Sequence, residues 1–203
     1  MRGKLGCIVG LVLAVVGALA LFVGSQAFLG GATIEEDTAY IIPAGSTLTS
    51  VAKDLEERGL ISSADGFLLR AKLFGGSTPI QAGEFELTAE MSQADMLSAF
   101  QSGDVIRRFI TIPEGMPSIM VFERLMAHEL LSGEIEIPPE GSVLPDTYDF
   151  ERGESRADVL ARMQSAMTTY LDQAWQERSA DAAVKSRQEA VILASIIEKE
   201  TQA

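Results

Sequence analysis

The hydrophobic and polar positions of this chain form short periodic segments that are separated by glycine and proline. Apolar residues in strand-like patterns predict strands at 40–42, 84–87 and 105–112. Apolar residues spaced three and four apart predict helices that end before Gly59, Gly75 and Gly103. Capping boxes at Ser62–Asp65 and Ser92–Asp95 mark two of the helix starts. This alternation of short strands and capped helices indicates an α+β fold.

Near the N-terminus, a long apolar run without charged residues departs from this alternation. It follows Arg2 and Lys4 and covers residues 5–29, which is long enough to span a bilayer. The basic flank predicts a cytoplasmic tail at 1–4, with the bulk of the chain on the opposite side of the membrane. Cleavage after Ala27 is the alternative, but the run is longer than a usual signal core. We therefore expect an uncleaved single-pass anchor at 5–29 and a linker at 30–37.

The net charge and the counts of cysteine and histidine argue against several kinds of partner and site. The net charge is −13 and no basic patch is present, so nucleic acid is disfavoured as a partner. Cys7 is the sole cysteine, which excludes an intramolecular disulfide, and its place at the start of the apolar run argues against a lipoprotein site. His128 is the sole histidine, which excludes a histidine-based metal cluster. We expect neither a metal site nor a cofactor.

Two further patterns lie in the middle of the chain. Ile42-Pro43-Ala44-Gly45 recurs as Ile112-Pro113-Glu114-Gly115, each time before an amphipathic helix, which suggests two related strand-turn-helix units. The turn-rich stretch 132–154 contains Leu144-Pro145-Asp146-Thr147-Tyr148-Asp149-Phe150. Tyr148 and Phe150 are spaced as on one face of a strand, and Asp146 can cap a local turn. Such a loop can line a sugar groove, although an ordinary surface connection is the default interpretation.

Carboxylates lie at the end of the last predicted helix, which Ser186 and Glu189 cap. On a helical projection, Glu200 falls on the apolar stripe of Leu193, Ile196 and Ile197, whereas Lys199 points away. A carboxyl group that loses hydration against apolar side chains retains its proton more readily, as a general acid must. Solvation at a helix end is the alternative, and on spacing alone it is the better one.

Taken in order, these motifs resemble the MltG (YceG-like) family of endolytic murein transglycosylases. The resemblance covers nearly the whole chain: the apolar N-terminal run, the Ile-Pro-Glu-Gly turn, the Pro-Asp-Thr-Tyr-x-Phe loop, and Ala194-Ser195-Ile196-Ile197-Glu198-Lys199-Glu200-Thr201. The octapeptide is highly specific, the loop moderately so. The implied fold class is α+β with an N-terminal transmembrane helix, a LysM-like βα module at 38–112, and the mainly helical start of a YceG-like catalytic domain at 113–203.

The resemblance implies a reaction and roles for single residues. The family cleaves the β-1,4 bond between N-acetylmuramic acid and N-acetylglucosamine and leaves 1,6-anhydro ends. Its catalytic glutamate maps to Glu200, with Glu198, Asp146 and Tyr148 as supporting residues. The implied location is the bacterial inner membrane, crossed once, with the bulk of the chain periplasmic or extracytoplasmic. The implied partners are peptidoglycan glycan strands, the membrane and proteins of cell-wall synthesis. Leu144 is a departure, because relatives often carry an aromatic residue there.

A second departure keeps another hypothesis open. Members of the family continue beyond the glutamate motif with Asn-Arg-Leu and Asp-Pro-Thr segments, which resemble the opposite wall of the cleft. We therefore expect this chain to correspond to a truncated form, either an enzyme or the N-terminal part of one. The alternative is a non-catalytic, membrane-anchored protein that binds peptidoglycan or acts as a scaffold.

Overall fold

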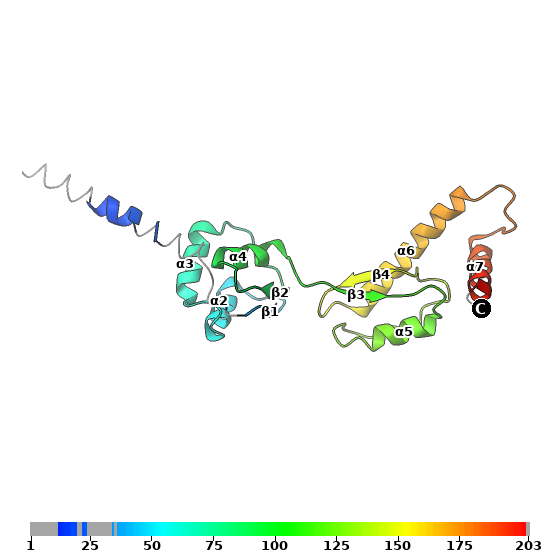
Figure 1. Cartoon of the computed structure of the whole chain (residues 1–203), viewed down its shortest axis with the longest axis horizontal. Coiled ribbons are helices and arrows are strands. Elements are labelled where there is room, and N and C mark those ends of the chain that lie inside the picture. Colours follow the sequence, from blue (N-terminus) through cyan, green and yellow to red (C-terminus); the bar gives the residue numbers. More distant parts are fainter. Residues whose placement is uncertain (1–11, 20–21, 24–33, 35, 202–203) are drawn as a thin grey trace, which may run out of the picture. The chain divides into compact units, whose positions relative to one another are not determined.

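The computed structural model describes residues 12–19, 22–23, 34 and 36–201. The chain divides into two compact units, Met1–Ile106 and Arg107–Ala203, each with its own hydrophobic core (Figure 1). The predicted boundary was 112/113. The strand that begins at Arg108 pairs within the second unit, and the division therefore lies before this strand.

The predicted membrane anchor requires a correction. In the part of the chain that the structure describes, no helix combines the length and the apolar character needed to cross a bilayer. This finding contradicts the transmembrane helix in the predicted fold class and the single-pass inner-membrane location derived from it. Most of the predicted segment 5–29, the tail 1–4 and most of the linker 30–37 lie outside the described residues. That prediction rested on the length and apolar character of the run, its basic flank and the family resemblance.

The first unit places three helices around a two-stranded antiparallel sheet. Its elements are β1 (Thr38–Ile42), α2 (Leu48–Glu57), α3 (Ala64–Phe74), β2 (Gly83–Leu87) and α4 (Gln93–Ser102). Strand β1 pairs with β2, and Tyr40 lies opposite Phe85. Both side chains are buried, and Phe100 of α4 contacts both rings at centroid distances of 5.9 Å and 5.1 Å. These three aromatic rings join the sheet to the last helix of the unit.

Helix starts in the first unit follow the capping signals closely. Helix α4 begins with the predicted box, because the Ser92 hydroxyl accepts from the Asp95 N–H and the Asp95 carboxylate accepts from the Ser92 N–H. At α3 the prediction was one residue early. Ser63, not Ser62, is the N-cap, because its hydroxyl accepts from the Gly66 N–H at 3.2 Å.

The capping box of α4 predicts a pH-dependent contribution to stability. Hydrogen bonds from the Ser92 hydroxyl and N–H hold the pKa of Asp95 below its usual value. Because the folded pKa lies below the unfolded value of about 3.9, the contribution is complete above that pH and is lost as pH falls through the folded pKa. We expect Asp95→Ala to lower the free energy of unfolding by roughly 0.5–1 kcal/mol near neutral pH.

Urea unfolding over a pH series checks this prediction. The difference between wild type and Asp95→Ala should shrink as the pH falls below about 4. Glu90→Ala, at an exposed carboxylate just before the helix, is the control and should change stability by less than about 0.5 kcal/mol. A deficit of equal size at every pH would show that the Asp95 carboxylate does not stabilise the helix through its charge.

The second unit combines another two-stranded antiparallel sheet with three helices. Its elements are β3 (Arg108–Thr111), α5 (Ser118–Met126), β4 (Thr147–Phe150), α6 (Arg156–Glu177) and α7 (Arg187–Thr201). Strand β3 is shorter than the predicted 105–112, because the Ile106 N–H donates to the Glu84 carbonyl of the first unit. Ser155 caps α6 as expected, with its hydroxyl accepting from the N–H groups of Ala157 and Asp158.

The repeated Pro-x-Gly segments adopt the same local structure. In each, a strand leads through the turn into a helix: β1 into α2, and β3 into α5. Gly45 and Gly115 have φ of +80° and +69°, a region that favours glycine. The N–H of Ser46 donates to Pro43, and that of Met116 donates to Pro113. The recurrence in the sequence therefore corresponds to two strand-turn-helix units, one in each half of the chain.

Candidate functional site

The proposed acid lies in the last turn of α7. Glu200 is exposed and Glu198 is half-buried. The apolar stripe beside them is exposed too: Leu193 retains 42% of its accessible surface, and Ile196 and Ile197 each retain 54%. Within the described residues, α7 buries none of its side chains. The stripe therefore does not enclose the carboxyl group of Glu200, although both share a helix face as the spacing predicts.

Three contacts hold α7 against the rest of the second unit. At its first turn, Arg187 forms an ion pair with Asp172 of α6 at 2.7 Å. Further along, Val191 packs directly over Gly141, where a Cβ atom would come within 2.5 Å of the valine methyl group. At its end, the Lys199 ammonium donates to the Gly115 carbonyl at 3.5 Å. The last contact places the final turn of α7, which carries Glu200, beside the turn that follows β3.

The loop residues Asp146 and Tyr148 serve the local structure of β4. The Tyr148 hydroxyl donates to the Leu144 carbonyl at 2.7 Å, and burial, together with the nearby Asp146 charge, raises the pKa of Tyr148. The Asp146 carboxylate accepts from the N–H of the next residue, Thr147, at 2.7 Å. Phe150 is buried in the core of the second unit, so its ring is not exposed for stacking against a ligand.

The predicted site residues come from two separate places in the second unit. The Ile112 N–H donates to the Asp146 carbonyl, which ties the start of β4 to the end of β3. Lys199 ties the end of α7 to Gly115, three residues further along. Among the described residues, no hydrogen bond or ion pair joins Glu200 to Asp146 or Tyr148. The carboxyl group and the two loop residues thus border the same turn without contacting one another.

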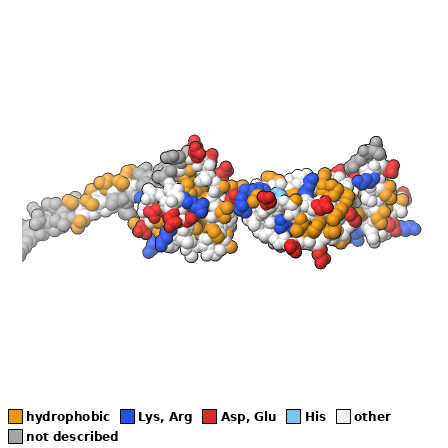
Figure 2. Space-filling model, turned by 90° about the horizontal axis from the view of Figure 1, so that it is seen from below, with side chains coloured by type: hydrophobic (Ala, Val, Ile, Leu, Met, Phe, Trp, Pro, Cys, Tyr) orange, Lys and Arg blue, Asp and Glu red, His pale blue; other side chains and the backbone are white. Residues whose placement is uncertain are grey.

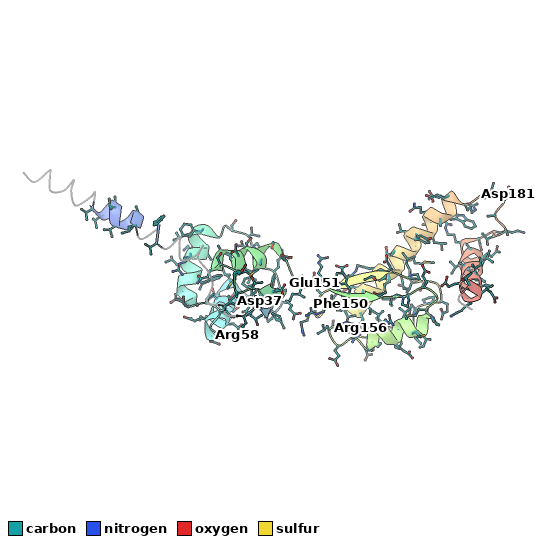
Figure 3. All side chains as sticks on the ribbon, in the orientation of Figure 1. Asp37, Arg58, Phe150, Glu151, Arg156 and Asp181 are labelled. Carbon is teal, nitrogen blue, oxygen red and sulfur yellow. The ribbon has the colours of Figure 1, made fainter. Side chains whose placement is uncertain are left out.

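Arg156 is a structural residue that the sequence patterns did not single out. Its guanidinium donates to four backbone carbonyls around the end of α5, those of Leu125, Met126, His128 and Gly133. Figure 3 labels Arg156. Leu125 and Met126 are the last two residues of α5, so the guanidinium acts as a C-terminal cap of this helix. At the other end of α5, the Glu140 carboxylate accepts from the Ser118 N–H. Two charged residues that are distant in the sequence thus cap the two ends of α5. At the N-terminal end, Glu140 takes the place of the N-cap residue Pro117, which makes no side-chain cap hydrogen bond.

A polar groove at one end of the β3–β4 sheet was also missed. Its walls are formed by Arg107, Asp149, Phe150, Glu151, Glu154 and Arg162, of which Figure 3 labels Phe150 and Glu151. Arg107 pairs with Asp149 at 2.6 Å, and Arg162 pairs with Glu154. The hydrogen bond to the Glu154 carboxylate raises the pKa of Arg162 above its usual value. Each residue is unremarkable in the sequence. The pairing of β3 with β4 and the contact of Arg162 on α6 with β4 bring these residues together.

Metal ligands do not gather in the described part of the chain, where no group of three or more His, Cys, Asp or Glu side chains could hold an ion. The His128 ring packs edge-on against Phe150 at 4.5 Å between centroids. This contact gives His128 a packing role next to the core of the second unit. At the candidate site itself, the Glu200 carboxyl group is exposed to solvent at the end of α7.

Comparison with known proteins supplies the family. The family model described as YceG-like matches residues 40–203. A crystal structure of a yceG-like protein from Listeria monocytogenes is 21% identical with a TM-score of 0.37, and the match covers 71% of this chain and 58% of that one. The chain thus spans less than two thirds of that relative's length. None of the curated proteins matches. With most of its length matched by the family model, this chain belongs to the YceG-like family.

Proposed function

We propose that this chain acts on peptidoglycan as a lytic transglycosylase or as the N-terminal part of one, with Glu200 as its catalytic residue. The observation that carries the proposal is the family's Glu-Lys-Glu motif on α7, with the Glu200 carboxyl open to solvent. Membership of the YceG-like family supports transglycosylase chemistry in general. An accessible carboxyl group beside an apolar stripe is suited to contact a bulky, partly apolar polymer.

The proposed reaction needs a single carboxyl group that acts twice. As an acid, Glu200 donates its proton to the oxygen of the β-1,4 bond between N-acetylmuramic acid and N-acetylglucosamine, and that bond breaks. As a carboxylate, it then accepts the proton of the muramoyl 6-hydroxyl, whose oxygen attacks the anomeric carbon and closes a 1,6-anhydro ring. Proton and electron pairs balance without water, and the carboxyl group regains its starting state.

The positioning of the glycan is assigned to other parts of the chain. Under this proposal, the first unit from residue 38 to residue 106 acts as a LysM-like glycan-binding module, and Asp146 and Tyr148 support the loop that borders the turn next to α7. Glu198 is assigned a positioning role on the same helix turn as Glu200. The acidic balance of the chain, −13, favours a polymer that is not recruited through phosphates.

A non-catalytic glycan-binding protein is the second candidate function. The observation that favours it is the exposed apolar face of α7, which leaves Glu200 without an enclosing apolar wall among the described residues. A carboxyl group in water lacks the desolvation that a general acid exploits.

Co-sedimentation with purified peptidoglycan, followed by analysis of the soluble fraction, separates the two candidates. The enzyme proposal predicts that the full chain binds the polymer and releases soluble muropeptides over time. Binding without release would favour the second candidate. Neither binding nor release would contradict both.

A further inference from the structure

The outer face of the β3–β4 sheet carries a large aromatic ring that the proposed chemistry does not use. Phe109 lies in the middle of β3 and retains 67% of its accessible surface. Its neighbours along the strand, Arg108 and Ile110, point to the opposite face, where Ile110 is buried in the core. An exposed phenylalanine does not contribute the stabilising free energy that burial would provide. Large exposed apolar side chains of this kind can mark a binding surface. Figure 2 shows apolar side chains on the surface of the second unit.

Hydrogen-bonding groups border the ring at both ends. Phe109 lies opposite Asp149 in the register, so both side chains project from the outer face, and Arg107 joins Asp149 there through the 2.6 Å ion pair. Two residues further along, the hydroxyls of Thr111 and Thr147 form a cross-strand hydrogen bond of 2.8 Å. The face thus presents, in line, an ion pair, an aromatic ring and a pair of hydroxyls.

The charges of this face favour a neutral ligand. Arg107 and Asp149 neutralise each other, as do Arg162 and Glu154 in the adjoining groove. Because exposed ion pairs contribute little, these side chains can turn to a ligand at small cost. A sugar ring has one apolar face of C–H groups that packs on an aromatic ring and a rim of hydroxyls that both donate and accept. The sequence of groups along the sheet matches both properties.

We propose that the outer face of the β3–β4 sheet is a saccharide-binding subsite, in which a sugar ring stacks on Phe109 between the Arg107–Asp149 pair and the Thr111–Thr147 pair. The proposal rests on the proposed function for the identity of the saccharide, a peptidoglycan glycan strand. It assigns binding, and no bond-breaking, to this face.

The subsite lies on the path to the proposed acid. The Thr111 end of β3 runs into the turn that contains Gly115, where Lys199 of α7 donates its hydrogen bond. Gly115 lies six positions after Phe109, a span of at most about 22 Å of extended chain. A glycan strand that crosses the sheet from Phe109 toward Thr111 therefore heads toward the last turn of α7, where Glu200 lies. The subsite would hold the strand a few sugar rings away from the cleaved bond.

Titration calorimetry with soluble N-acetylglucosamine oligosaccharides and with solubilised glycan strands tests the proposal. The full chain carrying Glu200→Gln is used so that the ligand is not consumed. We expect Phe109→Ala to weaken binding at least about tenfold, Phe109→Leu to do the same, and Phe109→Trp to retain affinity. The matched control is Tyr170→Ala, at an exposed aromatic residue of α6, which should leave affinity unchanged. Circular dichroism confirms that each variant is folded.

Several results would overturn the subsite. They are unchanged affinity in Phe109→Ala, full affinity in Phe109→Leu, no binding of either glycan by the parent chain, or self-association that Phe109→Ala abolishes in sedimentation. The last result would assign the face to a second copy of the chain. If the chain binds glycan in a Phe109-dependent way but never cleaves peptidoglycan, the proposed function is wrong and the subsite stands. If the chain cleaves peptidoglycan with a KM that Phe109→Ala leaves unchanged, the proposed function stands and the subsite is wrong.

Discussion

Replacement of Glu200 by glutamine is expected to abolish release of muropeptides from peptidoglycan, with a loss of at least about 100-fold in rate. Glutamine keeps the size and hydrogen-bonding reach of the side chain but has no proton to donate at the glycosidic oxygen. The side chain is exposed at the end of α7, so the substitution should leave the fold unchanged. Binding to the polymer should persist, because the proposal assigns binding to other surfaces.

Glu198→Gln is the matched control for this experiment. Glu198 lies two residues away on the same helix and is half-buried, and its assigned role is positioning. We expect a smaller loss of rate than for Glu200→Gln, with partial activity retained. Equal losses in both variants would indicate that the net charge of the α7 terminus matters, and not a specific acid. Undiminished release by Glu200→Gln would remove Glu200 from the mechanism.

Truncation of Phe100 to alanine is expected to destabilise the first unit by about 3–5 kcal/mol. Phe100 is fully buried and contacts the rings of Tyr40 and Phe85, so its removal leaves a cavity where α4 joins the sheet. Phe74→Ala, at a half-exposed phenylalanine of α3, is the control and should cost far less.

Because the chain has two units, the unfolding of each can be followed with a different signal. Trp175, the single tryptophan, lies on α6 in the second unit, where Arg178 stacks over its ring at 4.0 Å. Fluorescence therefore reports on the second unit, whereas far-ultraviolet circular dichroism reports on both. Phe100→Ala should produce an early transition in circular dichroism and leave the fluorescence transition in place. A coincident shift of both signals would show that the two units unfold as one.

The elements with local signals were predictable from the sequence. The box of Ser92 and Asp95 and the cap at Ser155 mark helix starts through hydrogen bonds that span two or three residues. The Pro-x-Gly turns were predictable for the same reason, since their geometry depends on glycine at positive φ. The family assignment was also predictable, and the YceG-like model over 40–203 confirms it.

Features that depend on distant partners were not predictable. The Arg107–Asp149 pair and the exposure of Phe109 follow from the register of β3 against β4, which local patterns do not specify. Arg156 binds carbonyls that lie 23 to 31 residues earlier in the chain. Periodicity placed Glu200 and Ile197 on one face of α7 correctly, but periodicity does not say what covers a face, and here the face is exposed. The membrane anchor, predicted from the length of the apolar run, its basic flank and the family resemblance, was wrong.

The chemical nature of the new chain ends in digested peptidoglycan tests the central claim most directly. Purified, uncleaved polymer is incubated with the full chain and, in parallel, with the Glu200→Gln variant, and the soluble products are analysed by mass spectrometry. The account predicts muropeptides that end in 1,6-anhydro-N-acetylmuramic acid, accumulating with the parent chain and absent with the variant. Products with ordinary reducing ends, or equal accumulation of anhydro ends in both samples, would contradict it.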